Sequence, residues 1–170
     1  LGRIDEDGYI HITGRKKEIY VSSGGKNVAP LVIEETMKSI PVISQFFLVG
    51  DGRKYCSALV TLDVGVILRD NLGMNPDKVP KDPIEQIEEL ERRGHKLSDF
   101  VESEEIRSDI ESQIMELNKR FMNPEQVKKF TILPRDLNID SGELTPTLKI
   151  RRKQIRENWA DEIEAMYSDA

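Results

Sequence analysis

The sequence has little of the residues from which covalent and metal sites are most often built. Its one cysteine, Cys56, cannot form an internal disulfide, which fits a protein kept in a reducing cytoplasm. The two histidines, His11 and His95, are too few and too scattered for a histidine metal site. The same scarcity leaves no Ser–His–acid or Cys–His set to assemble. We therefore expect no metal ligands, no nucleophile and no general base in this chain.

Long apolar runs are also absent. None approaches the roughly 20 residues of a membrane-spanning helix, and the start of the chain shows no signal-peptide pattern. The net charge of -6 argues against a surface that binds nucleic acid broadly. The 170 residues suffice for one domain with a core. Because the chain starts at Leu1 in a turn-rich segment, we expect it to be a piece of a longer protein.

The run Gly24-Gly25-Lys26 invites comparison with a phosphate-binding loop, but the spacing does not fit. A P-loop needs a glycine five residues before the Gly-Lys pair and Ser or Thr directly after it. Tyr20 and Asn27 occupy those two places. The sequence instead predicts a flexible loop over residues 23–27, between a strand and a helix.

The first third of the chain predicts short strands followed by one helix. Residues 1–8 are rich in turn formers and predict a loop. Residues 9–13 and 18–22 alternate apolar and polar side chains, which predicts two strands of a leading hairpin. Pro30 suits the first turn of a helix that continues, with apolar residues at helical spacing, to Ile40.

The rest of the chain predicts a sheet covered by helices. Strands are expected at residues 42–49, 55–62 and 127–133, with Cys56 as a small core residue. Asp82 and Ser103 have the features of helix caps, and apolar residues mark one stripe of the helix that Ser103 opens and one face of a last helix. The stripe consists of Ile106, Ile110, Ile114, Leu117 and Phe121, and the face of the last helix consists of Ile155, Trp159, Ile163 and Met166.

These patterns predict an α+β fold, with a leading two-stranded hairpin and a roughly three-stranded sheet flanked by helices. Residues 1–170 form one domain in this interpretation. Its helical stretch at about residues 64–103 is expected to be an insertion.

A basic stretch near the end is the most distinctive part of the chain. Pro146 fixes its own φ and pushes Thr145 toward extended backbone. Thr147 has the chemistry of a helix cap, so Lys149 is expected at a loop-to-helix junction on a short tether. From this stretch alone, a solvated basic helix start is the simpler interpretation.

Long, ordered motifs resemble the mobile C-terminal domain of adenylate-forming enzymes, and most of all that of long-chain acyl-CoA synthetases (long-chain fatty-acid–CoA ligases). The resemblance covers essentially the whole chain and is weakest over residues 64–103. The motifs that carry it are residues 7–19 (DGYIHITGRKKEI), 22–30 (SSGGKNVAP), 33–34 (IE), 128–134 (KKFTILP) and 142–149 (GELTPTLK).

The resemblance implies roles for three cations. Lys149 matches the lysine that serves adenylation, in which a carboxylate attacks the α-phosphate of ATP. A cation on a flexible stem can bridge those two anions. Lys17 matches the hinge position, and Arg15 matches the arginine near the ribose and phosphate of the nucleotide. One departure narrows the family: the wider superfamily usually has glycine directly before the catalytic lysine, whereas this chain has Leu148.

The resemblance also implies a loop for coenzyme A. Gly24 and Gly25 match the glycine loop that lines the pantetheine tunnel during thioester formation, and which of the two is the closer match stays open. Lys26 is within reach of a coenzyme A phosphate in this interpretation, although a solvated lysine is an equal alternative.

The resemblance implies ATP, Mg²⁺ and coenzyme A as cofactors of the full-length enzyme, with none bound to this fragment alone. The implied partners are its own N-terminal domain and the substrates, with no nucleic acid. We expect a cytoplasmic enzyme, and peripheral membrane association of the full-length enzyme stays open. So do acyl chain length and oligomeric state. Alternatives are a fatty acyl-AMP ligase that uses a carrier protein, another acid–CoA ligase, or a non-catalytic interaction module.

Overall fold

In the computed structural model, residues 2–4, 6–8, 10–12 and 18–168 are described. Their helices and strands, in chain order, are β1 (Gly2–Ile4), β2 (Ile10–Ile12), β3 (Tyr20–Val21), β4 (Asn27–Val28), α1 (Pro30–Met37), β5 (Ile43–Val49), β6 (Cys56–Leu62), α2 (Val64–Val66), a π-helical turn (Ile67–Asn71), a 3-10 turn (Pro76–Lys78), α3 (Pro83–Arg92), α4 (Leu97–Val101), α5 (Glu104–Asn118), a second 3-10 turn (Asn123–Glu125), β7 (Val127–Ile132), α6 (Arg152–Asn158) and α7 (Ala160–Tyr167).

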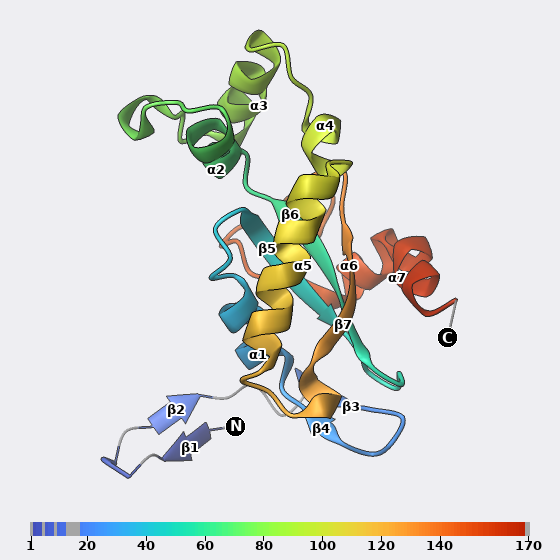
Figure 1. The fold of residues 1–170 in the computed structure, drawn as a ribbon. Helices are drawn as coiled ribbons and strands as arrows, with labels where there is room; N and C mark the ends of the chain where they lie inside the picture. The colour runs from blue at the N-terminus through green and yellow to red at the C-terminus, as the bar shows by residue number, and fades with distance from the viewer. Residues whose placement is uncertain (1, 5, 9, 13–17, 169–170) are drawn as a thin grey trace.

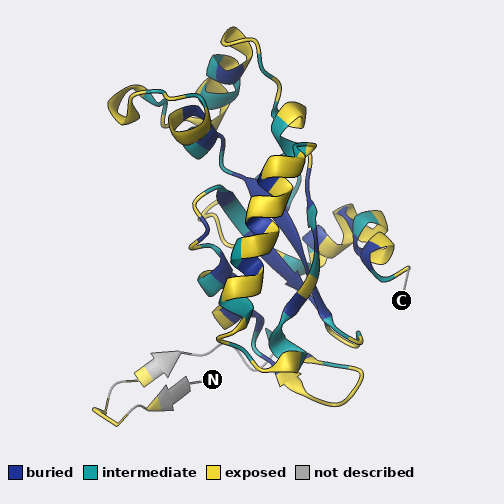
Figure 2. Cartoon of the chain, in the orientation of Figure 1, coloured by how far each residue is buried: buried dark blue, intermediate teal, exposed yellow. Residues whose placement is uncertain are grey.

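The centre of the fold is a three-stranded sheet in the order β5-β6-β7, in which β5 is antiparallel and β7 parallel to β6. Helices cover both faces, with α1 and α5 on one and α6 and α7 on the other (Figure 1). Phe46 and Leu48 belong to the first apolar cluster, and Phe47 and Val49 to the second. The expectation that this apolar strand is buried on both faces is therefore confirmed, as the dark sheet in Figure 2 shows.

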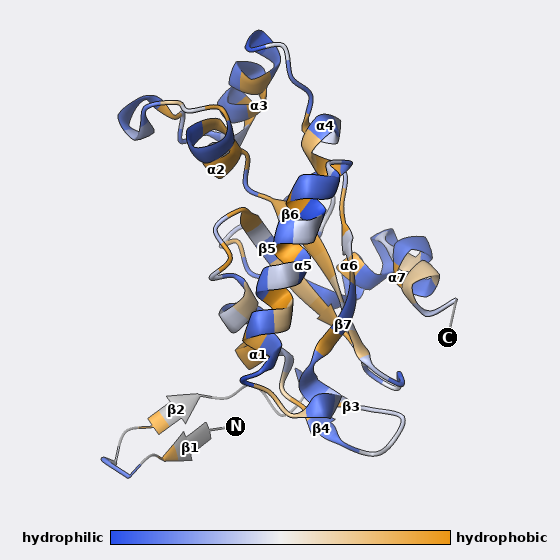
Figure 3. Ribbon diagram, in the orientation of Figure 1, coloured by the Kyte–Doolittle hydropathy of each residue, from blue (hydrophilic) through white to orange (hydrophobic). Residues whose placement is uncertain are grey.

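The predicted helices on the first face are confirmed. α1 begins at Pro30 and buries Ile33 and Met37. α5 begins after Ser103, whose hydroxyl accepts a hydrogen bond from the Ile106 N–H at 3.3 Å. Along α5 the apolar stripe turns toward the sheet and the charged residues face water, which gives the alternating colours of that helix in Figure 3.

The stretch between β6 and α5 is helical, as predicted, and extends beyond one end of the sheet (Figure 1). The Asp82 carboxylate caps α3, accepting from the N–H groups of Ile84 and Glu85 at 2.8 and 3.2 Å. Leu68 and Leu90 are fully buried and join the α1–α5 apolar cluster. α4, which lies between the predicted helices that Asp82 and Ser103 cap, was not predicted.

The predicted pairing of the first strands is wrong. β1, expected to be a loop, pairs with β2, and β3 pairs with β4. The physical reason lies in the two turns: Gly8 and Gly25 have φ of +84° and +77°, so each allows the chain to reverse over a few residues. Each short strand pairs across the nearest such turn. The fold class is unaffected, since a two-stranded hairpin still leads the chain.

The last helix is also not continuous. It is broken at Trp159, which has φ −117° and ψ 27° and separates α6 from α7. The predicted apolar face survives the break, because Ile155, Trp159, Ile163 and Met166 are all buried in the second cluster. At the break, the Trp159 Nε1–H donates a hydrogen bond to a buried carboxylate, Glu143, at 2.7 Å.

Glu143 anchors the segment between β7 and α6. Its carboxylate is fully buried and accepts from the Arg135 guanidinium at 2.8 and 3.1 Å, the Trp159 Nε1–H at 2.7 Å, the Asn158 amide at 3.2 Å and the Asn138 N–H at 3.3 Å. Burial alone would raise the pKa of this carboxyl. The hydrogen bonds from Arg135, Asn158, Trp159 and Asn138 outweigh burial and hold the pKa below its ordinary value.

Because its folded-state pKa is lowered, Glu143 stabilises the fold above its unfolded pKa, about 4.3, and loses that contribution as pH falls through the folded pKa. We expect Glu143→Gln to lower the free energy of unfolding by about 3 kcal/mol at pH 7 and by much less at pH 3. Urea denaturation of the chain at both pH values measures this.

Glu116→Gln is the matched control, because Glu116 forms only an exposed ion pair with Lys119. Its loss should stay below about 0.5 kcal/mol at pH 7. An equally small loss for Glu143→Gln, or a loss that does not change with pH, contradicts the role given to Glu143.

Candidate functional site

Lys149 closes a compact five-residue loop, residues 145–149, here called the Lys149 loop. Leu144 and Ile150 form an antiparallel bridge at its base. Within it, the Thr145 N–H donates to the Lys149 carbonyl and the Leu148 N–H donates to the Thr145 carbonyl, each at 2.8 Å. Four hydrogen-bonding positions are thus satisfied inside the loop, so Lys149 stands on an ordered turn.

Thr145 organises this loop through its side chain as well. Its hydroxyl accepts from the Lys149 N–H at 3.0 Å and lies 3.0 Å from the Thr147 hydroxyl. The expected helix cap at Thr147 is therefore wrong: α6 begins only at Arg152, after Arg151. Sequence reasoning missed Thr145 as a loop-forming side chain, since a threonine before proline indicates extended backbone and nothing more.

Leu148 has left-handed backbone geometry, with φ +63°. It is the one non-glycine residue with positive φ among those the structure describes. A side chain at such an angle costs about 1–2 kcal/mol relative to glycine. This explains why glycine suits the position before the lysine, and shows that the leucine here keeps the same backbone shape at a cost.

The Lys149 side chain is exposed. Over the described part of the chain, its ammonium group has no hydrogen bond or ion pair. Arg151, Arg152 and Lys153 follow at once, and with Gln154 and Glu157 they line a hollow of about 370 Å³. Arg152 is paired with Glu34 and Lys153 lies 4.0 Å from the Glu157 carboxylate, so the exposed Arg151 is the cation here that favours phosphate groups of a bound ligand.

Arg152 joins the Lys149 segment to the opposite side of the domain. Its guanidinium donates to the buried Glu34 carboxylate at 3.0 Å and to the Tyr20 hydroxyl at 3.3 Å. Glu34 also accepts from the Leu48 N–H at 2.9 Å, and the Tyr20 hydroxyl donates to the Leu48 carbonyl at 2.9 Å. Arg156 adds a second guanidinium on the Tyr20 oxygen at 3.1 Å.

The contacts of Arg152 and Tyr20 explain the direction in which the pKa of each side chain is shifted. Burial works to lower the pKa of Arg152, but the hydrogen bonds and charge of Glu34 outweigh it, so the net pKa is raised and Arg152 stays charged. Burial raises the pKa of Tyr20, and the two arginines only partly offset that effect. Tyr20 therefore stays a neutral hydroxyl that donates to backbone.

The second predicted element is the glycine loop, expected at residues 23–27. In the structure this loop spans residues 22–26, between β3 and β4, because Asn27 already belongs to β4. The Ser22 N–H donates to the Lys26 carbonyl and the Gly25 N–H to the Ser22 carbonyl, both at 2.9 Å. The Ser23 N–H donates to the Arg53 carbonyl at 2.9 Å, which holds the loop against the turn between β5 and β6. Lys26 is exposed.

The two glycines differ in what they require. Gly25, with φ +77°, needs glycine for its backbone angle. Gly24 does not have such an angle, and a Cβ placed on it would meet only the Ser22 Oγ at an ordinary 3.9 Å. Among the described residues, no contact explains why residue 24 should be glycine.

Arg15 and Lys17, predicted for nucleotide binding and for the hinge, lie outside the described residues. The Lys149 loop and the glycine loop are both described and are separate sites. The glycine loop is hydrogen-bonded to the β5–β6 turn, at one end of the sheet. The segment that carries Lys149 leaves the C-terminal end of β7, at the other end of the sheet, and is anchored by Glu143. The link between the two segments is Arg152 with Tyr20.

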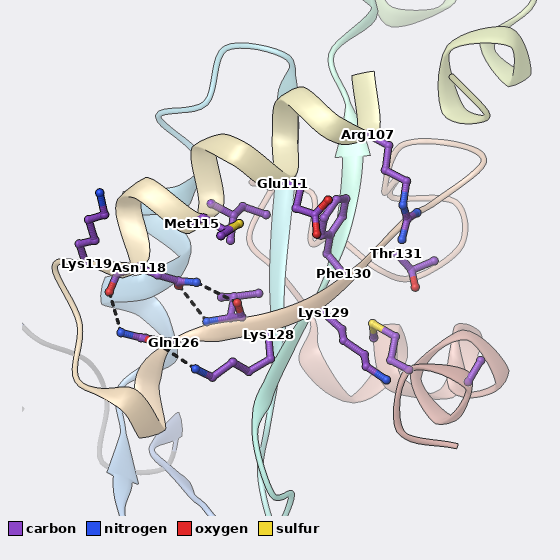
Figure 4. Close-up of a pocket in the computed structure, with 14 residues that line it drawn as sticks. Arg107, Glu111, Met115, Asn118, Lys119, Gln126, Lys128, Lys129, Phe130 and Thr131 are labelled. Atoms are coloured by element: carbon purple, nitrogen blue, oxygen red, sulfur yellow. Dashed lines mark hydrogen bonds between the residues drawn. The ribbon is translucent and has the colours of Figure 1, made fainter. Parts of the chain in front are cut away.

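A further hollow, of about 770 Å³, lies between α5, β7 and α7 and is lined by none of the predicted site residues (Figure 4). Cations on its rim are Arg107, Lys119, Lys128 and Lys129. Among the described residues that line it, the one carboxylate, Glu111, forms no hydrogen bond to a hydroxyl or thiol group, so we assign the hollow no chemistry.

Metal and thiol chemistry find no support in the described part of the chain. It contains no group of three or more His, Cys, Asp or Glu residues placed to hold a metal ion. The predicted core position of Cys56 is confirmed, and burial, with a smaller effect of Glu125, raises the pKa of its thiol to about 11. Among the same residues, no helix is both long and apolar enough to cross a membrane.

Comparison with known sequences finds similar proteins that are named long-chain-fatty-acid–CoA ligases. The chain is 38% identical over 173 residues to FadD15 of Mycobacterium tuberculosis, which covers 99% of this chain and 26% of that protein. It is 35% identical over 174 residues to ACSBG2 of Gallus gallus, which covers 100% of this chain and 22% of that protein. The chain thus spans about a quarter of the length of these relatives.

Solved structures share the fold. The adenylation domain of a carboxylic acid reductase from Segniliparus rugosus, in complex with AMP and a co-purified carboxylic acid, matches with a TM-score of 0.65 and 18% identity, over 98% of this chain and 24% of that chain. That of a carboxylate reductase from Mycobacterium chelonae matches with a TM-score of 0.64 and 19% identity, over 97% of this chain and 24% of that chain.

A profile of the family described as "AMP-binding enzyme C-terminal domain" matches residues 17–98 and 90–170. The two segments together extend over most of the chain, and the predicted α+β fold agrees with the solved adenylation domains. The chain therefore belongs to the family of AMP-binding enzyme C-terminal domains.

Proposed function

We propose that residues 1–170 are the C-terminal lid domain of a long-chain fatty-acid–CoA ligase, with a helical insertion at about residues 64–103. The observation that carries the proposal is that relatives named for this activity align with 99–100% of the chain at 35–38% identity. Because the chain spans about a quarter of their length, the reaction is assigned to the full-length protein and this domain supplies one side of its active site.

The proposed reaction has two steps. A fatty-acid carboxylate oxygen attacks the α-phosphorus of ATP, and the bond from that phosphorus to the bridging oxygen breaks, giving acyl-AMP and pyrophosphate. The thiol of coenzyme A then attacks the acyl carbon, AMP leaves and the thiol proton is released, giving the thioester.

Lys149 is the residue proposed to act in the first step. The attack brings two anions together, and a cation that touches both the carboxylate and the α-phosphate lowers their repulsion. Its exposed ammonium group, which no described residue neutralises, supports this role, because the charge is available to an incoming ligand. Arg151, an exposed cation two residues on, adds to the field that attracts the phosphates.

The remaining roles follow the same proposal. Lys17 is the hinge, Arg15 binds the nucleotide, and Gly24 and Gly25 line the path of the pantetheine arm, with Lys26 near a coenzyme A phosphate. The open space around Gly24 supports a close approach by a ligand or another domain, since nothing within the chain requires glycine there.

The partners of this domain are its own N-terminal domain and the three substrates. The described residues hold no group of three or more His, Cys, Asp or Glu placed to bind a metal ion. We place the Mg²⁺ that accompanies ATP in the N-terminal domain and derive no step through it here. We place the enzyme in the cytoplasm, in keeping with a single, buried, unpaired cysteine.

We expect the 170-residue chain alone to form no acyl-CoA, because the acyl pocket and the ATP site lie in the domain it lacks. Incubation with ATP, Mg²⁺, a long-chain fatty acid and coenzyme A, followed by thioester quantification, tests this. The full-length protein under the same conditions is the positive control. Thioester made by the isolated chain would show that this domain holds a complete site.

In the full-length protein, Lys149→Ala should reduce acyl-AMP formation at least about a hundredfold, since the cation between the two anions is lost. Thioester formation from supplied acyl-adenylate should change less than about threefold. Each half-reaction is measured separately. Lys119→Ala is the control, because Lys119 is an exposed cation that lies beyond the end of α5, outside the Lys149 segment, and it should leave both rates unchanged. Equal losses in the two half-reactions for Lys149→Ala contradict the assignment.

Gly24→Ala should selectively slow thioester formation, by about tenfold, because a Cβ would narrow the path of the pantetheine arm. Folding should be unaffected, since the new Cβ meets only the Ser22 Oγ at 3.9 Å. Thermal unfolding and the two half-reactions are measured in parallel. Gly25→Ala, which strains the backbone, serves for comparison and should lower the melting temperature. A Gly24→Ala enzyme with unchanged thioester formation rules out a close approach at this residue.

A further inference from the structure

Leu148 combines two features that each cost free energy. Its φ of +63° is disfavoured for any side chain, and the other described residues with positive φ are all glycines. Its side chain is apolar and 64% exposed to water. A glycine at this position would remove both costs and would keep the hydrogen bonds of the loop, which use only backbone at residue 148.

Strain of this kind persists where the surroundings hold it in place, and it concentrates at functional sites. The surroundings here are the Lys149 loop itself: the Leu148 N–H is bonded to the Thr145 carbonyl, and the next N–H is bonded to the Thr145 hydroxyl. The loop therefore presents the leucine side chain outward, one residue before the lysine, in a fixed arrangement.

We propose that Leu148 is a positioning residue, whose side chain is buried against the N-terminal domain of the same protein when Lys149 reaches the reacting phosphate. The occupant of this contact is the absent N-terminal part, because the chain spans only about a quarter of its relatives and the proposed partner of Lys149 lies in the rest. The inference rests on the proposed function. It adds to that function an apolar contact that holds the Lys149 ammonium group in position.

The contact explains why both costs are retained. Burial of a leucine side chain on docking stabilises the docked arrangement, and its neighbour Lys149 is then held within reach of the two anions. The contact forms only in the arrangement that serves adenylation. Loss of the side chain should therefore affect the first half-reaction and spare the second.

The experiment uses the full-length protein with Leu148→Ala, Leu148→Gly and Leu148→Met. We expect Leu148→Ala and Leu148→Gly to lower the kcat of acyl-AMP formation about tenfold, with KM for ATP and fatty acid within about twofold of the parent. Leu148→Met, which keeps an apolar side chain of similar volume, should retain most of the rate. Thioester formation from supplied acyl-adenylate should be unchanged in all three, which also verifies that the variants are folded.

Ile84→Ala is the matched control, because Ile84 is an apolar residue on α3 with a similar exposure of 70%. It should leave both half-reactions unchanged. The proposal is overturned if Leu148→Ala adenylates at the parent rate, if it loses both half-reactions equally, or if Leu148→Gly keeps the parent rate, since the side chain then has no role.

Lys149→Ala, measured alongside, separates this inference from the proposed function. If Lys149→Ala abolishes adenylation and the Leu148 variants do not, only the docking contact is wrong. If Lys149→Ala adenylates normally, the proposed function of this loop fails and the Leu148 proposal fails with it.

Discussion

The buried ion pair between Glu34 and Arg152 holds together parts of the chain that are far apart in sequence. Two charges removed from water stabilise a fold only when their remaining donors and acceptors are satisfied. Here the Glu34 carboxylate also accepts a hydrogen bond from the Leu48 N–H, and the Arg152 guanidinium donates one to the Tyr20 hydroxyl. Four elements, α1, β3, β5 and α6, therefore meet around one pair. The same contacts satisfy the N–H and the carbonyl of Leu48 on β5, which lies at an edge of the sheet.

The elements that the sequence predicted correctly are those whose signals are local. Pro30 and the caps at Asp82 and Ser103 act within a single helical turn, and the apolar run of β5 is readable residue by residue. The pairing of β1 to β4 was not predictable in this way, because strands of two or three residues carry too little pattern to select a partner. The break at Trp159 was hidden for a different reason: the apolar spacing continues across it, and the hydrogen bond that Trp159 makes at the break is to Glu143, sixteen residues earlier.

The same distinction between local signals and three-dimensional contacts applies to the candidate site. The resemblance supplied Lys149, Gly24 and Gly25, but a motif does not describe how the backbone presents them. Three hydrogen-bonding groups of Thr145 and the left-handed Leu148 define the loop, and they became visible only in three dimensions. The replacement of the usual glycine by Leu148 was a signal in the sequence. Interpreted from the sequence, it only narrowed the family, although a usual glycine is also a signal of the special backbone angle that glycine favours.

Because the Lys149 loop and the glycine loop are both ordered, the motion between two half-reactions must occur outside these loops. The Lys149 loop is closed by its own hydrogen bonds, its base is anchored through Glu143, and α6 is tied to β3 through Arg152 and Tyr20. The glycine loop is held in turn against the β5–β6 hairpin. Bringing first one loop and then the other to the substrates by local rearrangement would break several of these buried contacts. Turning the domain as one body breaks none of them, so the change is best accommodated before β3, where the proposed hinge residue Lys17 lies in the sequence.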